Sequence, residues 1–320
     1  MSYRRVVLST ALVATAIFTI PLCLPYLAPS ASRPLITPSQ PAWDAPPLTI
    51  LAGLPREYVP TAGNRRRLLL IGDIHGMNTD LGHLLDSARY DVSRDHVVAL
   101  GDMINRGPDS HGVVARLMGM NASAVRGNHE DDLLRALRDD DDGSVGPDRD
   151  KMLRLAATLT PEQLRWLDRL PLILAAEPLR VYLVHAGLVP GVRPDRQDPW
   201  AVMNMRTLVY PQEELRRDAQ PVAVPKDDRS GEPWAKVWDR HAKHLARADR
   251  RTVVYGHDAK RGFVEGKYAV GLDSACARGG ALTALVVEAG TKRKPFRYTT
   301  VQVPCKQHAH AAHAPPTPPV

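Results

Sequence analysis

Three short segments of the sequence place metal-binding side chains next to glycines. They are Gly72-Asp73-Ile74-His75-Gly76, Gly101-Asp102-Met103-Ile104-Asn105-Arg106-Gly107 and Gly127-Asn128-His129-Glu130. Each segment follows a short run of apolar residues, as at the end of a buried β-strand. Glycine lets the backbone turn sharply close to a ligand, and zinc, manganese and iron accept carboxylate and imidazole ligands. The three segments therefore predict a metal site.

Two later histidines occur in the same setting. They lie in Val184-His185-Ala186-Gly187 and Tyr255-Gly256-His257-Asp258, again after apolar runs. A single Asp or His after a strand is usually a helix cap or a turn residue. Five such segments, each with an Asp, Asn or His beside glycine, instead indicate that these side chains act together.

The elements that would position these segments alternate between strand and helix. Apolar runs at 67–72, 96–101 and 123–126 predict strands, with helices between them at 78–90 and 110–120. This β-α-β-α-β order is typical of a parallel sheet, whose strands bring ligands together at their carboxyl ends. Further strands are expected at 181–184, 252–255, 268–272, 282–287 and 298–303.

Over about residues 68–287, these motifs resemble those of the calcineurin-like metallophosphoesterases, in particular the branch with the Ser/Thr protein phosphatases and the symmetrical diadenosine tetraphosphatases. The resemblance implies an α/β fold of two packed mixed β-sheets flanked by helices (α/β/β/α). It also implies two divalent metal ions, with zinc favoured over manganese, cobalt or iron. Its ligands for one ion are Asp73 and His75, for the other Asn128, His185 and His257, with Asp102 as the bridge. Two such ions ~3.5–4 Å apart would acidify a bridging water molecule, whose hydroxide would attack phosphorus in line.

The same resemblance implies roles for residues beside the metal ions. His129 matches the general acid that protonates the leaving oxygen, Arg106 matches a phosphate-binding arginine, and Arg206 is a candidate for a second phosphate contact. Asn105 departs from the protein phosphatases, which have an aspartate there that orients and charges the catalytic histidine. An amide cannot stabilise an imidazolium as a carboxylate does. Because phosphate leaves an anhydride as a stable anion, Asn105 favours phosphoanhydride substrates over phosphoproteins.

Segments 252–262 and 269–280 further resemble the fungal vacuolar, zinc-dependent endopolyphosphatases, which cleave inorganic polyphosphate. Lys260 and Arg261, with Lys267 and Arg278 nearby, would contact phosphates beyond the scissile bond. Three alternatives stay open: a nucleotide hydrolase like the symmetrical diadenosine tetraphosphatases, a Ser/Thr protein phosphatase, and an inactive membrane-tethered scaffold. We see no recognised nucleic-acid-binding motif, and at 5% the aromatic residues are too few for a stacking platform.

Both ends of the chain differ from its middle. Residues 6–27 carry no charge and would span about 33 Å as a helix, so residues 1–29 predict a type II membrane anchor or a cleaved signal segment. Residues 30–63 predict a Pro-rich linker, and residues 304–320 a disordered Pro/His-rich tail. The catalytic domain, 64–303, would then face a lumen, with the vacuole favoured. In such a lumen Asn121-Ala122-Ser123 is a glycosylation sequon.

The amino-acid composition excludes several classes of protein. A chain of 320 residues with 44% hydrophobic and 24% charged residues is neither disordered throughout nor collagen-like nor a multi-pass membrane protein. Its net charge of +7 favours anionic partners. Three cysteines exclude a disulfide framework, although Cys276 and Cys305 could pair. The sequence predicts no oligomeric state.

Overall fold

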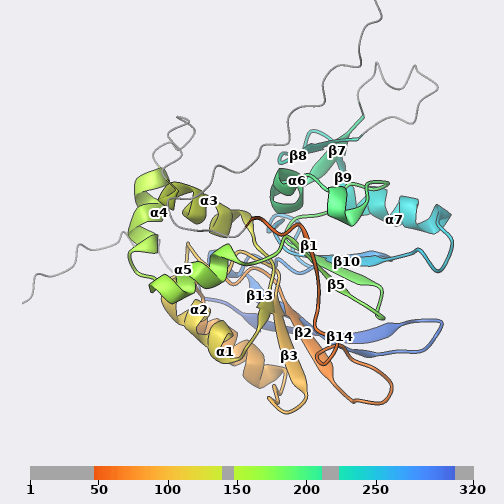
Figure 1. The fold of residues 1–320 in the computed structure, drawn as a ribbon, viewed down its shortest axis with the longest axis horizontal. Coiled ribbons are helices and arrows are strands. Elements are labelled where there is room, and N and C mark those ends of the chain that lie inside the picture. The colour runs from red at the N-terminus through yellow and green to blue at the C-terminus, as the bar shows by residue number, and fades with distance from the viewer. Residues whose placement is uncertain (1–46, 139–147, 211–222, 307–320) are drawn as a thin grey trace, which may run out of the picture. The chain divides into compact units, whose positions relative to one another are not determined.

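The computed structural model describes residues 47–138, 148–210 and 223–306 (Figure 1). The predicted anchor or signal segment, the first half of the predicted linker and residues 307–320 lie outside this part. Among the helices of the described residues, none is both long enough and apolar enough to cross a membrane.

One large sheet has five strands in the order β14-β13-β2-β3-β4. Strands β2, β3 and β4 run parallel, while β13 pairs antiparallel with both β14 and β2. The carboxyl ends of the three parallel strands therefore meet at one edge of the sheet. The strands are β2 (Arg67–Ile71), β3 (Asp95–Ala99), β4 (Ser123–Ala124), β13 (Ala281–Ala289) and β14 (Phe296–Pro304).

The other large sheet has six strands in the order β1-β5-β6-β10-β12-β11. Its centre, β6-β10-β12, is parallel, and β5 and β11 pair antiparallel with β6 and β12. The strands are β1 (Leu51–Gly53), β5 (Ile173–Ala176), β6 (Val181–Val184), β10 (Thr252–Tyr255), β11 (Val264–Glu265) and β12 (Ala269–Gly271). A small antiparallel sheet contains β7 (Thr207–Val209), β8 (Val224–Lys226) and β9 (Glu232–Pro233).

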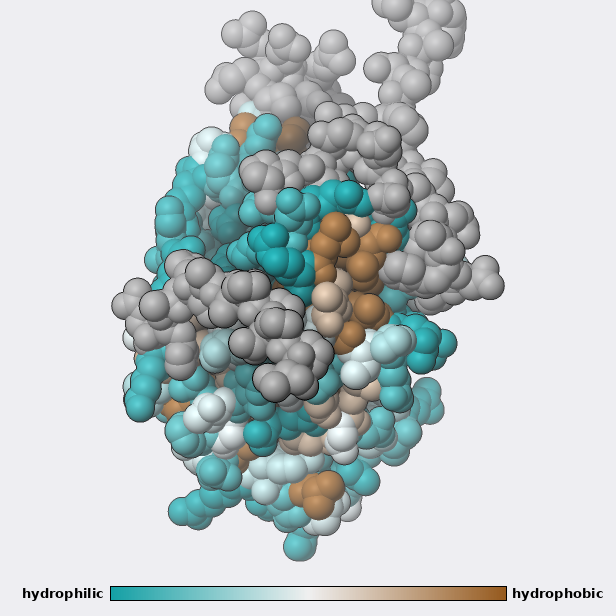
Figure 2. All heavy atoms as spheres, turned by 90° about the vertical axis from the view of Figure 1, so that its left-hand side faces the viewer, coloured by the Kyte–Doolittle hydropathy of each residue, from teal (hydrophilic) through white to brown (hydrophobic). Residues whose placement is uncertain are grey.

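Helices cover the outer faces of both large sheets (Figure 1). Those on the five-stranded sheet are α1 (Asn78–Ser87), α2 (Ser110–Gly119), α3 (Asn128–Leu137), α4 (Asp148–Ala156) and α5 (Pro161–Asp168). Those on the six-stranded sheet are α6 (Pro199–Asn204) and α7 (Trp234–His244). On the side of α4, hydrophilic residues cover most of the surface and apolar residues gather in one area (Figure 2).

Alternating side chains of the strands form three apolar layers. In β2, Leu69 and Ile71 pack toward the helices, whereas Leu68 and Leu70 pack between the two sheets. A third layer joins the six-stranded sheet to α6 and α7. This α/β/β/α order confirms the predicted fold class. The predicted strands at 181–184 and 252–255 coincide with β6 and β10.

The folded domain begins before residue 64, so the predicted linker of residues 30–63 is wrong in its last part. β1 pairs in parallel with β5, and Leu54 and Val59 are buried between the sheets. The sequence did not reveal β1, because a strand of three residues in a Pro-rich segment shows no alternation of apolar and polar residues. Its partner strand, β5, also lies far along the chain. The domain also ends later than predicted, because β14 includes Pro304 and Cys305 is bonded to Cys276.

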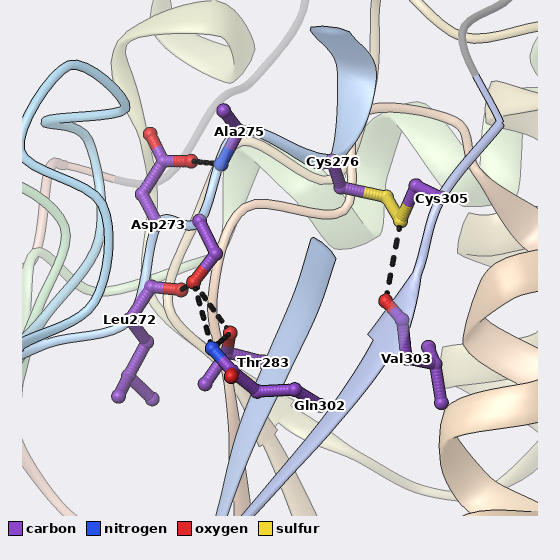
Figure 3. Close-up of a disulfide and its surroundings, with 9 residues drawn as sticks. Leu272, Asp273, Ala275, Cys276, Thr283, Gln302, Val303 and Cys305 are labelled. Atoms are coloured by element: carbon purple, nitrogen blue, oxygen red, sulfur yellow. Dashed lines mark hydrogen bonds between the residues drawn. A yellow bond between two sulfur atoms is a disulfide. The ribbon is translucent and has the colours of Figure 1, made fainter. Parts of the chain in front are cut away.

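The disulfide between Cys276 and Cys305 joins the loop after β12 to the end of β14 (Figure 3). From the sequence, Cys276 and Cys305 were the two cysteines that could pair. The same loop contains Asp273, whose carboxylate accepts a hydrogen bond from the backbone N–H of Ala275 at 3.0 Å. The loop also contains Arg278, so the disulfide fixes a segment that carries a cation near the carboxyl ends of the strands.

His96, a buried residue of β3, contacts the segment between β1 and β2. Its ring stacks on Tyr58 with centroids 3.8 Å apart, and its Nε2 lies 2.9 Å from Ser123 Oγ. Burial, followed by the nearby Arg66 charge, lowers the pKa of His96 to about 4. Below pH 6.5 the unfolded chain therefore binds a proton that the folded chain does not.

We expect this histidine to destabilise the fold in acid. Above pH 6.5 this histidine leaves the free energy of unfolding unchanged. As the pH falls from 6.5 toward 4, it lowers that free energy, by about 2 kcal/mol at pH 5. Urea unfolding at pH 7.5 and 5.0 checks this result, with His96→Gln losing less stability between the two pH values than the wild type. The exposed His244, changed to Gln, is the control. Equal acid losses in wild type and His96→Gln would contradict the assignment.

Candidate active site

The structure brings all six predicted metal-ligand side chains together. Each follows the carboxyl end of a parallel strand: β2, β3, β4, β6 or β10. They are Asp73, His75, Asp102, Asn128, His185 and His257. Asp102 is central, since its carboxylate oxygens lie 3.3 Å from His185 Nε2 and 3.6 Å from His75 Nε2. It belongs both to a cluster with His75 and to one with His185 and His257, as a bridging ligand would.

Backbone carbonyls set the tautomer of three of these histidines. His75 Nδ1 lies 3.1 Å from the carbonyl of Ile104, His185 Nδ1 2.8 Å from that of Leu100, and His257 Nε2 3.0 Å from that of Asn204. A carbonyl only accepts, so each of these nitrogens carries the proton. The other nitrogen of each ring therefore directs a lone pair into the cluster.

The resulting cluster suits a cation. His185 Nε2 and His257 Nδ1 lie 3.1 Å apart, and both lie 3.1 Å from Asn128 Oδ1. The single proton of each ring lies on the opposite nitrogen, which donates to a backbone carbonyl, so three electron-rich atoms face one another. In addition, the buried Asp73 Oδ2 has no hydrogen-bond partner in the described part of the chain. A buried oxygen without a partner is costly unless a cation binds it, so the donor set fits divalent metal ions.

For three of the ligands the local electrostatics favour the protonation states that metals require, whereas burial, followed by the nearby Asp273, raises the pKa of Asp73. Burial lowers the pKa of His75 to about 3 and lowers that of His257 well below its usual value. Burial alone would raise the pKa of Asp102, but the surrounding imidazoles, His185 foremost, bring it below its usual range. The site therefore offers neutral imidazoles and a carboxylate at physiological pH.

His129 differs from the three ligand histidines. The backbone N–H of Arg106 donates to Asn105 Oδ1 at 2.8 Å, which turns the Asn105 amide so that its Nδ2 faces His129 Nδ1, also at 2.8 Å. An NH₂ group donates, so Nδ1 accepts and the ring proton lies on Nε2. That Nε2 lies 3.7 Å from Asp102 Oδ2. His129 thus presents an N–H to the cluster, whereas the ligand histidines present lone pairs.

The backbone around the site is strained. His75, Asp102, Asn105, Arg106 and His257 all have positive φ, between 48° and 68°. Non-glycine residues in this region cost about 1–3 kcal/mol each and concentrate at functional sites. At Gly256 the requirement for glycine is steric, since a Cβ there would lie 2.0 Å from Asp73 Oδ1. Because glycine has no Cβ, the His257 backbone N–H can donate to that oxygen at 2.9 Å.

Glu130 is a residue whose role the sequence analysis missed. Its fully buried carboxylate accepts backbone N–H groups of the loop that holds Asp102 and of Gly127, which precedes α3. The donors are Gly127 at 2.9 Å, Asp102 and Met103 at 2.8 Å, and Ile104 at 3.3 Å. Glutamate three residues after the N-cap is half of a capping box, and because the N-cap is Gly127, which has no side chain, this half is all the signal that the sequence contains.

A cleft of about 440 Å³ opens beside the ligand cluster and includes His257 in its wall. Five cationic side chains line it, together with the carboxylates of Asp227, Asp228 and Asp258. The cations are Arg106, Arg206, Arg229, Lys260 and Arg278. The sequence analysis did not single out Arg229, because no motif surrounds it.

Two other predicted cations do not line this cleft. Arg261 Nε lies 3.0 Å from Asp258 Oδ2, so this carboxylate engages its guanidinium. Lys267 lies over the ring of Tyr268, with its ammonium 5.6 Å from the ring centroid. The prediction that both contact substrate phosphates is therefore not supported by the cleft.

Fold and site together define a metal-dependent phosphoesterase. The profile of the calcineurin-like phosphoesterases matches residues 66–266. The chain belongs to this family.

Relatives with two different named activities are similar to this chain. The chain is 24% identical over 280 residues to the zinc-dependent endopolyphosphatase of Saccharomyces cerevisiae, covering 75% of this chain and 81% of that one. It is 30% identical over 268 residues to the symmetrical bis(5'-nucleosyl)-tetraphosphatase of Paracidovorax citrulli, covering 68% of this chain and 91% of that one. A crystal structure of a protein assigned as a diadenosine tetraphosphatase covers 81% of this chain and 99% of its own, with a TM-score of 0.63 and 30% identity.

Proposed function

We propose that the protein is an endopolyphosphatase, which hydrolyses internal phosphoanhydride bonds of inorganic polyphosphate. The observation that carries the proposal is the lining of the cleft. Five cations and three carboxylates line it, and Phe, Tyr and Trp do not occur among its lining residues in the described part of the chain. A chain of phosphates needs positive charge along its length, whereas an adenine base is usually held by stacking on an aromatic ring.

The ligand clusters support two divalent ions, one at Asp73 and His75 and one at Asn128, His185 and His257, with Asp102 shared. Zinc is the ion we favour, because a relative is named for zinc dependence. When bound, such ions supply the charge that stabilises phosphoryl transfer and acidify the attacking water.

Residues of the chain itself would bind the substrate and direct the proton. Arg106 lines the cleft and directly follows Asn105, so its guanidinium can bind the phosphate next to the metal ligands. His129 offers its Nε2–H to the leaving oxygen as a hydrogen-bond donor. Since Asn105 donates to the opposite ring nitrogen, the imidazole is held neutral, which suits a leaving group that needs no proton.

A symmetrical dinucleoside tetraphosphatase is the second candidate. It is supported by the 30% identity to the Paracidovorax citrulli enzyme. Such a substrate also contains phosphoanhydride bonds, so the same ligands and the same neutral His129 would serve it. The two candidates differ in whether a base must be bound next to the phosphates.

The deciding experiment uses the full chain, stripped of metal and reconstituted separately with zinc, manganese, cobalt or magnesium. Each form receives long-chain polyphosphate, diadenosine tetraphosphate or a phosphoserine peptide. Endopolyphosphatase activity requires metal-dependent polyphosphate fragments of intermediate length on sizing gels. Cleavage of the dinucleotide alone would overturn the proposal in favour of the second candidate, and turnover of the phosphopeptide alone would favour a protein phosphatase.

We further propose that the domain acts on the lumenal side of a membrane, with the vacuole favoured. The disulfide supports this, because such bonds persist in oxidising compartments and are rare in the cytosol. The uncharged run of residues 6–27 supports it from the sequence. A tag at the C-terminus of the full chain should resist protease in sealed vesicles until detergent is added. Digestion without detergent would place the domain in the cytosol.

A further inference from the structure

Asp258 gathers three guanidinium groups at the edge of the cleft. Its Oδ1 lies 2.5 Å from Arg229 Nη2 and 4.0 Å from Arg206 Nε, and its Oδ2 lies 3.0 Å from Arg261 Nε. The carboxylate is 10% exposed, whereas the three arginine side chains are 30–38% exposed. The anion is thus covered while the cations around it still reach solvent.

The arginines come from separate parts of the chain. Arg206 lies between α6 and β7, and Arg229 lies in the turn between β8 and β9. Asp258 directly follows His257, one of the predicted metal ligands. One carboxylate therefore connects the small three-stranded sheet to the metal-ligand cluster.

Two of these arginines keep donors free for a ligand. A guanidinium has five N–H donors, of which Asp258 engages one on Arg229 at hydrogen-bond distance. Arg206 donates through Nη1 to the carbonyl of Asp227 at 2.8 Å. Both side chains line the cleft. Phosphate oxygens can accept the remaining N–H groups, for which the planar fork of arginine is suited.

We propose that Asp258 is a positioning residue for substrate binding, which holds Arg206 and Arg229 where they contact successive phosphates of a condensed phosphate chain. The inference rests on the proposed function, since it names how the same cleft binds that substrate class. Lys260 and Arg278 line the same cleft and form no ion pair within 4 Å in the described part of the chain. They complete a cationic surface around the two positioned arginines.

Whether removing the Asp258 charge strengthens or weakens phosphate binding distinguishes a positioning role from a simple charge effect. Asp258 is an anion beside an anion-binding cleft, so charge alone predicts that its removal strengthens phosphate binding. Positioning predicts the reverse, because three guanidinium groups would lose their shared partner and repel one another. Asp258→Asn keeps the size of the side chain and removes the charge, so it tests the two directly.

The binding experiment titrates tripolyphosphate by calorimetry into the full chain stripped of metal, so that the ligand is not hydrolysed during the titration. We expect the Kd to rise about tenfold in Asp258→Asn and in Arg229→Ala, as for the loss of one charge-assisted hydrogen bond. Asp258→Glu should restore part of the affinity, because it returns the carboxylate. The control is Arg297→Ala, whose guanidinium pairs with Glu288 on the β13–β14 hairpin and lies outside the cleft lining. Its Kd should match the wild type.

Kinetics supply a second readout. With tripolyphosphate as substrate, we expect the two weakened variants to raise KM more than they lower kcat. The same variants should raise KM less for p-nitrophenyl phosphate, which has a single phosphate. A structural defect would instead lower kcat for both substrates and depress the melting temperature.

The outcomes distinguish this inference from the proposed function. If the wild type binds tripolyphosphate but cleaves no polyphosphate, the endopolyphosphatase proposal fails, and the loss of affinity in Asp258→Asn still supports the positioning role. If the wild type cleaves polyphosphate while Asp258→Asn binds tripolyphosphate equally well or more tightly, the positioning role is overturned and the function stands.

Discussion

Replacing Asp102 by Asn is expected to lower kcat by about 10³-fold, with a clear loss of bound metal. The carboxylate oxygens of Asp102 lie 3.3 Å from His185 Nε2, 3.6 Å from His75 Nε2 and 3.7 Å from His129 Nε2. It is the one side chain shared by both ligand clusters of the described residues. An amide has the same shape without the charge, and ion stabilisation worth several kcal/mol corresponds to about three orders of magnitude in rate.

The measurement pairs steady-state kinetics with metal analysis by mass spectrometry on the same samples. Asp195→Asn is the matched control, because Asp195 pairs with Arg193 in an exposed loop. The control should keep both its metal content and its kcat. A variant at position 102 that kept full metal content and more than about a tenth of the activity would show that Asp102 is not the shared ligand.

The ligand cluster could be predicted from the sequence because each part of it is local. His185 follows β6 and His257 follows β10, whose limits coincide with the expected strands. A short apolar run followed by glycine and a polar side chain carries this information within a few residues. Parallel strands then bring such positions to one edge without any further signal.

Four of the five cations that line the cleft were named from the sequence, but Arg229 could not be predicted in the same way. Arg229 lies in a turn of the small sheet β8-β7-β9, whose strands have two or three residues and show no alternation. Its contact with Asp258 joins segments 29 positions apart in the chain. The tautomer of His129 could not be predicted either, because it depends on the orientation of the Asn105 amide, which accepts a hydrogen bond from the backbone N–H of Arg106. These features arise from tertiary packing rather than from a local pattern.

Changing Asn105 to Asp is expected to shift the substrate preference toward phosphate monoesters by about 100-fold relative to polyphosphate. In the wild type the Asn105 amide donates to His129 Nδ1 at 2.8 Å, and burial lowers the pKa of His129. The imidazolium form is therefore scarce at pH 7. A carboxylate would accept a hydrogen bond from Nδ1–H and stabilise the imidazolium, which can then protonate a serine or phenol oxygen as it leaves. General-acid catalysis contributes roughly 10²–10⁴-fold to such reactions.

The pH profile gives the sign of the effect. A reaction that needs the imidazolium slows as the pH rises through the pKa of His129. Because Asp at position 105 raises that pKa, the alkaline limb for monoesters should move to higher pH in Asn105→Asp. Hydrolysis of polyphosphate should change little, since its leaving phosphate needs no proton.

The role of His129 in this shift is tested by a double-mutant cycle. His129→Ala should remove the monoester gain of Asn105→Asp, because the carboxylate then has no imidazole to charge. The ratio of phosphoserine peptide to polyphosphate turnover is measured for all four proteins at pH 6, 7 and 8. An unchanged ratio in Asn105→Asp, or a gain that survives without His129, would show that substrate preference does not depend on the protonation of this histidine. The expected result would instead assign the preference for anhydrides to a single amide, which holds the imidazole neutral beside the metal ligands.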